Sequence, residues 1–385
     1  MTGQGYDLVS VDKRRDWIQE RVGGRFHHIA SFSTPTDEMR GNIENAIGVA
    51  QVPLGVAGPL LIHGKHASGT FYVPMATTEG ALVRSYERGM VAITRAGGAT
   101  TRTYADENRI APVFLFDDVT EAHDFACSLP ELFEEIRQEA ESTTRYGKLV
   151  RIECHPIGRE VIVTFSYRTG DAHGMNMIAK ATQRACQTII SRSRAQRFYL
   201  FSGFSSEKRA SGSILTGGKG KKTIAGARLG PSCMRTYLHT TPRQMVELWR
   251  HTMLGHLQAS AIGYNGHLAN GLTAIFLACG QDVANVVNSA VGITNFELTA
   301  EGDLYASVTL PSLTVATIGG GTALGTAREC LQILGCEGED KALKLAEIVA
   351  AALLAGELSM GAAIASGEFV EAHESYGRNR PRSNE

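Results

Sequence analysis

Residues 346–377 read AEIVAAALLAGELSMGAAIASGEFVEAHESYG, a pattern that predicts one long helix running to Gly377 at its end. His373 would lie in the last turn, where a histidine interacts favourably with the helix dipole. No apolar run in the chain approaches the roughly 20 residues that span a bilayer. We therefore expect this helix to organise a folded domain, and not to cross a membrane.

The rest of the chain divides into segments by composition and by the periodicity of its apolar residues. A charged N-terminal stretch, 1–40, predicts a helical arm, and the Gly- and Lys-rich loop 205–222 precedes the long helical patterns. Residues 147–170 alternate like two antiparallel strands around a turn, and 171–192 reads as a helix. The segment from about 111 to 200 thus predicts a small α+β domain, and the tail after 377 predicts disorder.

The composition limits the class of protein. The chain has 385 residues, 43% hydrophobic and 20% charged, which suits two or three folded domains. Lys and Arg total 38 against 39 acids, so no field of one sign favours nucleic acid or an anionic membrane. Small molecules and other subunits are the expected partners.

The cysteines and the N-terminus predict a compartment. Seven cysteines, odd in number and without CxxC spacing, indicate neither a disulfide framework nor a metal site. The polar start MTGQGYDLVSVDKRRDW lacks the apolar core of a signal peptide. These features predict a cytoplasmic protein with reduced thiols and no metal.

Two segments could face a cofactor. In 313–334 an apolar run, a glycine loop containing Gly319 and Gly320, and a helical pattern could aim backbone N–H groups at a phosphate. The spacing is GxGxxxG, so a tight strand-to-helix turn is the alternative. In GDAHGMNM, residues 170–177, the methionines could face a flat ring or only pack.

Three charged residues are ambiguous when taken one at a time. Glu79, in MATTEGALV, could complement a helix dipole, and Lys208 could be a solvated loop cation. Asp282 follows the apolar run LTAIFLACG, where burial without a partner would cost several kcal/mol. None of these residues identifies a reaction on its own.

Taken together, six motifs resemble the hydroxymethylglutaryl-coenzyme A (HMG-CoA) reductases, most closely their class I branch. In chain order they are ENAIGVAQVPLGVAGPL, PMATTEGALV, GDAHGMNM, GYNGHLANGLTAIFLACGQD, LPSLTVATIGGGT and LLAGELSMGAAIASGEFVEAH. They cover about residues 40 to 378. The chain lacks the membrane anchor domain of the animal members, so a soluble bacterial or archaeal form is expected.

The resemblance implies an α+β fold, with a large domain of unusual topology around a long central helix and a small ferredoxin-like NADPH domain inserted into it. The implied large substrate and catalytic domain comprises 41–110 and 201–372, the small domain 111–200, and a mobile C-terminal segment 373–385. It also implies a homodimer or larger assembly with the active site at a subunit boundary.

The resemblance assigns the chemistry to four residues. These enzymes reduce a thioester to a primary alcohol with two NADPH through a hemithioacetal and an aldehyde. Lys208 matches the lysine that stabilises oxyanion charge, and Glu79 matches the glutamate that protonates the carbonyl oxygen. Asp282 matches the aspartate linking the two, and His373 matches the histidine that protonates the coenzyme A thiolate. Proximity of the two carboxylates should keep Glu79 able to donate a proton.

Binding residues carry over in the same way. The resemblance places Asp171, Met175 and Asn176 beside the nicotinamide. The 2′-phosphate of NADPH would be met by Thr144, Arg145, Tyr146 and Arg378. Coenzyme A would be met by Ser85 and Arg88, although a solvated helix face is the alternative for Arg88. The acyl group would be met by Arg109, Ser202, Arg209 and Asn270.

One position departs from the family pattern. Counted back from Arg235, the place of a second substrate-binding lysine falls on Ser232, and Arg209 or Arg228 could compensate. A lost charge-assisted contact is worth roughly 1.5–3 kcal/mol. Two substrates therefore stay open: HMG-CoA, reduced to mevalonate, or another acyl thioester on coenzyme A or a carrier protein. A non-catalytic homologue would lack some of the four catalytic residues, and all four are present.

Overall fold

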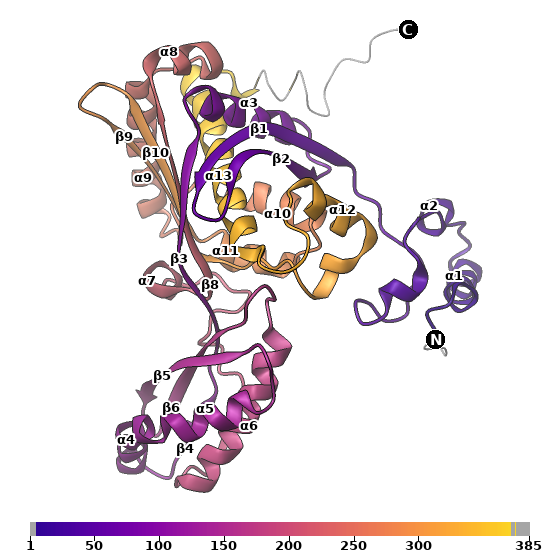
Figure 1. The fold of residues 1–385 in the computed structure, drawn as a ribbon, viewed down its shortest axis with the longest axis vertical. Helices are drawn as coiled ribbons and strands as arrows, with labels where there is room; N and C mark the ends of the chain where they lie inside the picture. Colours follow the sequence, from indigo (N-terminus) through magenta and orange to yellow (C-terminus); the bar gives the residue numbers. More distant parts are fainter. Residues whose placement is uncertain (1–4, 371–373, 375–385) are drawn as a thin grey trace.

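The computed structural model describes residues 5–370 and Glu374. Figure 1 shows an upper body built around helix α13 (Ala342–Ser366), a lower lobe formed by the middle of the chain, and an N-terminal arm beside the body. Helices and strands are mixed in both the body and the lobe, which confirms the predicted α+β class.

Helix α13 forms the centre of the upper body. It is apolar on nearly all faces, so it must be surrounded on all sides. It packs against α3 (Leu82–Arg95), α9 (Pro242–Gln258) and α10 (Leu268–Ala278), and against strands of the sheet. At the crossing with α3, a Cβ on Gly89 would lie 1.9 Å from the Ala355 carbonyl oxygen, so only glycine permits this approach.

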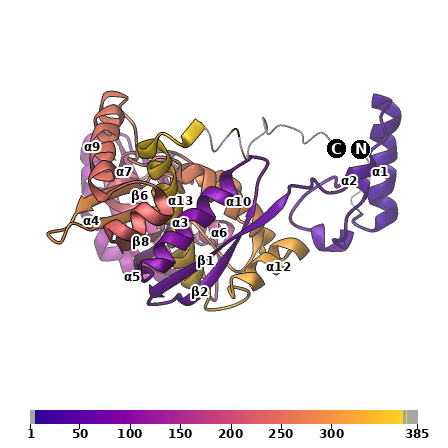
Figure 2. The ribbon, with the colours of Figure 1, turned by 90° about the horizontal axis from the view of Figure 1, so that it is seen from above.

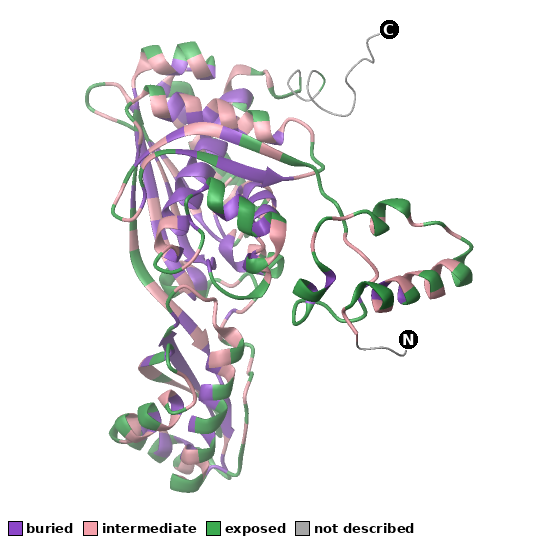
Figure 3. Cartoon of the chain, turned by 45° about the vertical axis from the view of Figure 1, so that its right-hand side comes forward, coloured by how far each residue is buried: buried purple, intermediate pink, exposed green. Residues whose placement is uncertain are grey.

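The predicted extent of this helix was too long. The helix ends at Ser366 because Gly367 takes the left-handed conformation, φ 80°, which closes its C-terminus. The described residues contain one helix long and apolar enough to cross a membrane, contrary to the expectation that no run comes near that length. This helix is α13, and 83% of its most apolar window is buried inside the protein. Figure 3 shows it as the buried centre of the body.

The upper sheet lies against α13. Its strands are β1 (Leu54–Gly64), β2 (Ser68–Ala76), β3 (Ala99–Ile110), β8 (Gly220–Leu229), β9 (Ile293–Leu298) and β10 (Leu304–Leu313). The order β3-β8-β10-β9 is antiparallel, and β1 joins β2 antiparallel and β3 parallel. Helix α12 (Gly325–Ile333) follows β10 through the glycine loop.

The lower lobe has its own core, drawn from residues 110 to 195. Its elements are β4 (Val113–Leu115), α4 (Val119–Ser128), η2 (Leu129–Leu132), α5 (Phe133–Glu141), β5 (Lys148–Ile157), β6 (Glu160–Arg168), α6 (Met175–Arg192) and β7 (Arg197–Tyr199). Strands β5 and β6 pair antiparallel, which confirms the hairpin predicted from their alternating pattern.

Strand β3 connects the two cores. Its first part pairs with β8 of the body, and its last three residues, Asn108 to Ile110, pair with β6 of the lobe. The chain returns from β7 to the body through the loop containing Lys208 and the short helix α7 (Ser213–Gly217). Residues near the end of β3 and in this loop therefore meet where the lobe joins the body.

The N-terminal arm comprises α1 (Leu8–Val22), α2 (His27–Ala30) and η1 (Thr36–Met39). Figure 2 shows α1 and α2 standing apart from the body. The arm has a very small core, with Val11, Met39 and Ala46 buried. The shorter elements of the body are α8 (Pro231–Cys233), η3 (Met234–Leu238), η4 (Val283–Asn285), α11 (Val286–Ser289) and η5 (Gly320–Ala323).

Candidate active site

Glu79 lies in the turn between β2 and α3. The helix begins only at Leu82, after Ala81 takes a left-handed conformation with φ 69°. The exposed carboxylate of Glu79 accepts two hydrogen bonds from the Asn270 amide, at 3.1 and 2.9 Å. Glu79 and Asn270, predicted for different roles, therefore lie together.

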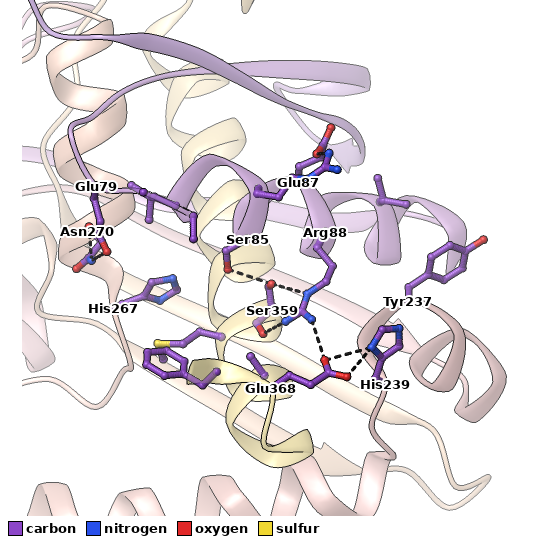
Figure 4. Close-up of a pocket in the computed structure, with 18 residues that line it drawn as sticks. Glu79, Ser85, Glu87, Arg88, Tyr237, His239, His267, Asn270, Ser359 and Glu368 are labelled. Carbon is purple, nitrogen blue, oxygen red and sulfur yellow. Dashed lines mark hydrogen bonds and ion pairs between the residues drawn. The ribbon is translucent and has the colours of Figure 1, made fainter. Parts of the chain in front are cut away.

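A pocket of about 700 Å³ opens beside Glu79. Figure 4 shows Glu79 and Asn270 at one end, Ser85 in the middle and Arg88 toward the other end. The predicted coenzyme A residues thus share a cavity with the predicted proton donor. Its volume lies within the range of small-molecule sites.

The far end of this pocket holds a cluster of charges. Arg88 donates through Nε to the Ser359 hydroxyl at 3.0 Å and through Nη2 to the Ser359 carbonyl at 2.6 Å. Its Nη1 lies 3.7 Å from Glu368, which also contacts His239 Nδ1 at 2.9 Å. Burial lowers the pKa of Arg88, and Glu368 opposes that shift. Arg88 is therefore a held, partly buried cation and not part of a solvated helix face.

His267 lines the same pocket and was not predicted. Its Nδ1 lies 3.0 Å from Glu357 Oε1, and its Nε2 is buried without a partner. Burial raises the pKa of Glu357, but hydrogen bonds from His267 and from backbone N–H groups lower it more, so it stays below its usual value. His267 belongs to the quoted motif GYNGHLANG, but its spacing alone gave no signal of a role.

Lys208 and Asp282 form a second site. Lys208 Nζ lies 2.7 Å from Asp282 Oδ2, as the resemblance implied. Both side chains are partly exposed, 44% and 40%, so a ligand can reach them. Ser206 and Lys208 both have left-handed backbones, φ 59° and 53°, which cost roughly 1–2 kcal/mol each for residues other than glycine.

Buried charges lie beneath this loop. The fully buried Lys219 forms an ion pair with Glu207, and Glu207 Oε1 lies 3.8 Å from His173 Nε2. Burial lowers the pKa of Lys219 to about 7, which Asp282 opposes. Burial also lowers the pKa of His173 to about 4, helped by the charge of Lys219. The sequence did not distinguish Lys219 from the other lysines of GGKGKK.

The predicted cofactor segments border the Lys208 site. Ala172 forms a parallel bridge with Ile318, so the turn before α6 lies against the glycine loop. Gly319 and Gly320 are exposed and left-handed, with no atom within 4 Å of where a Cβ would lie. Lys219 Nζ lies 3.7 Å from Met175 Sδ. The open glycines and the start of α6 leave backbone accessible, as a nucleotide requires.

Asp171 has a structural position that the sequence did not suggest. Its carboxylate accepts hydrogen bonds from the backbone N–H groups of Asp340, Lys341 and Ala342, at 2.6 to 3.0 Å. These groups lie at the start of α13, where a negative charge is favourable. The side chain predicted beside the nicotinamide is therefore directed at a helix terminus in this structure.

The predicted 2′-phosphate stretch lies at the edge of the lobe. Thr144 Oγ1 accepts from the N–H of Tyr146 and Gly147, which forms a tight turn. The hydroxyl also contacts Met177 Sδ at 2.8 Å, and this places the turn against the first turn of α6. Arg145 and Tyr146 are exposed there, and Asn176 is exposed on α6.

Two of the four predicted acyl-group residues, Arg109 and Ser202, lie near the end of β3, whereas Asn270 lies beside Glu79. Arg109 Nη1 donates to the Gly217 carbonyl at 2.7 Å, and burial lowers its pKa. Ser202 donates through its hydroxyl to the Ala111 carbonyl at 2.7 Å, so it holds the crossing between lobe and body. Arg209 is exposed on the Lys208 loop. Among the described residues, no group of three His, Cys, Asp or Glu could hold a metal ion.

Within this chain, Glu79 and the Lys208–Asp282 pair lie toward opposite ends of α10. Glu79 binds Asn270 in the first turn of α10, whereas Asp282 lies four residues beyond its last residue, Ala278. The helix rises about 12 Å between Asn270 and Ala278. No described contact joins Glu79 to Lys208 or Asp282. The described contacts of this chain therefore do not place the Glu79 and Asp282 carboxylates next to each other.

Ser232 lies far from the Lys208 site and does not line the pocket beside Glu79. It is exposed on α8, three residues after β8 ends, whereas Lys219 and Glu207 lie at the start of that strand. Ten residues of strand span about 33 Å. In one protomer Ser232 contacts neither Lys208 nor the pocket beside Glu79. His373 and Arg378 lie outside the described residues.

Comparisons with known proteins identify the family and the fold that this chain shares. A sequence model of the family "Hydroxymethylglutaryl-coenzyme A reductase" matches residues 10–378. The chain is 44% identical to 3-hydroxy-3-methylglutaryl-coenzyme A reductase of Methanocaldococcus jannaschii, covering 96% of this chain and 93% of that protein. It is also 44% identical to the reductase of Methanothermobacter thermautotrophicus, covering 96% and 95%. A solved reductase from Streptococcus pneumoniae, 18% identical, superposes with a TM-score of 0.70 over 94% of this chain and 99% of that one, which shows a shared fold.

Proposed function

The chain belongs to the hydroxymethylglutaryl-coenzyme A reductase family, and from that membership we propose that it reduces HMG-CoA to mevalonate and free coenzyme A with two NADPH. The observation that carries the proposal is the Lys208–Asp282 pair at 2.7 Å, beside the open glycine loop and the start of α6. A solved relative from Streptococcus pneumoniae is described as bound to NADPH.

In the proposed reaction, Lys208, Glu79 and His373 each have a separate catalytic role. NADPH supplies a hydride at each of two reductions. Lys208 stabilises the oxyanion that develops on the thioester carbonyl, and Glu79 protonates that oxygen to give the hemithioacetal. When the C–S bond breaks, the hemithioacetal hydroxyl returns its proton to Glu79, an aldehyde and a thiolate form, and His373 protonates the thiolate. The aldehyde then accepts the second hydride, and Glu79 gives its oxygen a proton, which yields the primary alcohol.

The binding residues follow from the same proposal. We assign the lobe, residues 111–200, and Gly319 and Gly320 to NADPH, with Arg145 and Arg378 at the 2′-phosphate. Ser85 and Arg88 hold coenzyme A in the 700 Å³ pocket, and Arg109 binds the free carboxylate of the acyl group. The position of Asp171 at the start of α13 supports a role in shaping the turn that carries Met175, not a direct cofactor contact.

The catalytic set is completed between two protomers. The support for this is the separation of Glu79 from Lys208 along α10, because a single chain leaves the proton donor and the oxyanion cation apart. In a symmetric dimer, the Glu79 pocket of one protomer would meet the Lys208 site of its partner twice. The seven unpaired cysteines support a reducing, cytoplasmic location.

Two experiments test this proposal. NADPH oxidation is measured with HMG-CoA and with neutral acyl-CoAs. Turnover only with a neutral acyl thioester would reject HMG-CoA as the substrate and favour the alternative acyl group.

The dimer is tested by complementation. Glu79→Gln and Lys208→Met chains are inactive alone, and refolding them together forms mixed dimers. If the site spans two protomers, each mixed dimer has one intact site, and random pairing restores about a quarter of wild-type activity. No recovery, with mixed dimers shown to form, would place the whole set in one chain.

A further inference from the structure

Lys219 is a buried cation that the proposed reaction does not use. It precedes β8, and its side chain is 0% exposed. The ammonium contacts the Glu207 carboxylate and lies 3.7 Å from Met175 Sδ. A buried ammonium is retained only when it is paired, so Glu207 is its counter-ion.

Glu207 lies at the strained point of the Lys208 loop. The residues on either side, Ser206 and Lys208, both have left-handed backbones, φ 59° and 53°. Such conformations persist where surrounding contacts hold them, and they concentrate at functional sites. The ion pair with the buried Lys219 holds Glu207, the middle residue of this turn, from the protein interior. The next residue, Lys208, pairs with a different carboxylate, Asp282, at 2.7 Å.

We propose that Lys219 is a positioning residue for this reaction: by holding Glu207, its ammonium keeps the 206–208 turn in the conformation that directs Lys208 at Asp282. The inference rests on the proposed function, because it assigns Lys219 the task of placing the cation that stabilises the oxyanion. Lys219 itself does not touch the reacting atoms.

The chain offers a matched control two residues away. Lys221 is also buried, 4% exposed, and its Nζ lies 3.0 Å from Asp106 Oδ1. Both lysines belong to the same stretch of backbone at the start of β8, but Asp106 belongs to β3 and not to the Lys208 loop. Removing either cation breaks a buried ion pair. Only the removal of Lys219 should disturb the placement of Lys208.

The surroundings of Lys219 add a dependence on pH. Burial lowers its pKa to about 7, whereas nearby carboxylates favour its charged form. The charged groups near Lys219 are Glu207, which contacts it, and Asp282, whose charge favours its protonated form. His173, 3.8 Å from Glu207, is in turn affected by the charges of Lys219, Lys208 and Lys221. An exposed lysine would lose its proton near pH 10.4. We expect an alkaline decline of kcat at a lower pH, as Lys219 loses its proton and releases Glu207.

The experiment compares Lys219→Met with Lys221→Met in the full chain, by NADPH oxidation with HMG-CoA and by thermal unfolding. We expect kcat of Lys219→Met to fall about 30- to 100-fold, while KM for both substrates stays within about threefold. Lys221→Met should lose comparable thermal stability and keep kcat within about threefold. A folded Lys219→Met with kcat no lower than that of Lys221→Met would overturn the proposal.

A third variant separates positioning from stability. Lys219→Arg keeps a charge that does not titrate in this range, so it should retain more of kcat than Lys219→Met and move the alkaline decline upward by about one pH unit or more. An unshifted decline would overturn the proposal even if Lys219→Met does not fold. Failure of the proposed function is distinct, because the wild-type protein itself would then not oxidise NADPH with HMG-CoA.

Discussion

The pocket beside Glu79 and the site around Lys208 both contain charged side chains, but they have different roles in the proposed reaction. The first is a cavity of about 700 Å³ in which an exposed carboxylate is held by one neutral amide, Asn270. The second is a partly exposed ion pair on a strained turn, supported from below by Lys219 and Glu207. A long substrate needs volume, whereas charge stabilisation needs a cation that cannot move. The second site accordingly places its cation on a turn with two left-handed residues, next to the buried Lys219.

The largest effect should come from the Lys208 site. Lys208→Met removes the charge but keeps most of the side-chain volume, so kcat should fall by about 10³-fold or more. Binding of NADPH, measured by fluorescence titration, should stay within about threefold. Turnover within tenfold of wild type would end the assignment of Lys208 as the oxyanion cation.

The next effect tests the carboxylate of the pocket. Glu79→Gln keeps the contact with Asn270 but removes the proton donor, and general acid catalysis contributes about 10²- to 10⁴-fold. We expect kcat to fall by about 10²-fold with KM for HMG-CoA nearly unchanged. A change confined to KM would show that Glu79 binds the substrate and does not donate the proton. The pocket would then contribute to binding alone.

The Lys208 site should also set part of the acid sensitivity of folding. Burial, together with Lys219, lowers the pKa of His173 to about 4, whereas an unfolded histidine titrates near 6.5. Between these values the unfolded chain binds a proton that the native state does not, so stability is lost as pH falls from about 6.5 to 4. The loss for this group is at most about 3 kcal/mol.

Chemical denaturation at several pH values measures this loss. His173→Gln should reduce the slope of the free energy of unfolding against pH between about 4 and 6.5. The matched variant His123→Gln, at an exposed position on α4, should leave this slope unchanged. Equal slopes for the wild type and His173→Gln would show that His173 is not held neutral beside Lys219.

A smaller effect should appear as binding alone. Arg88→Ala removes the held cation at the far end of the pocket, and a charge-assisted contact is worth roughly 1.5–3 kcal/mol. KM for HMG-CoA should rise about 10- to 100-fold with kcat within about threefold. Arg137→Ala, which removes an exposed arginine paired with Glu134 on α5, should change neither. Loss of kcat in Arg88→Ala would mean that the pocket contributes to chemistry as well as to binding.

The smallest effect is expected at Ser232. The departure from the family pattern at Ser232 predicts by itself that Ser232→Lys raises affinity for HMG-CoA. Because Ser232 is exposed and lies beyond the end of β8 that is far from Lys208, we expect instead a change in KM of less than about twofold. A tenfold decrease in KM would show that a partner protomer brings this position to the acyl group.

Several elements were predictable because their signal is local. The β5–β6 hairpin follows from alternation, and α13 follows from a run of small and apolar residues. The end of α13 at Gly367 was missed because a helix-compatible pattern continues past it, and only the backbone conformation shows the stop. The motifs located Glu79, Lys208 and Asp282, and the Lys208–Asp282 contact was predicted from the family resemblance.

The family, the central helix and the residue types that the chemistry requires can all be read from the amino-acid sequence. The folded structure was needed to show that β3 joins two cores, that α10 separates Glu79 from Lys208, and that Lys219 and Lys221 of GGKGKK are buried against different carboxylates. These features need the folded structure because the burial, partner and pKa of a side chain depend on contacts between residues far apart in the chain, whereas its ionisable group is set by its covalent structure.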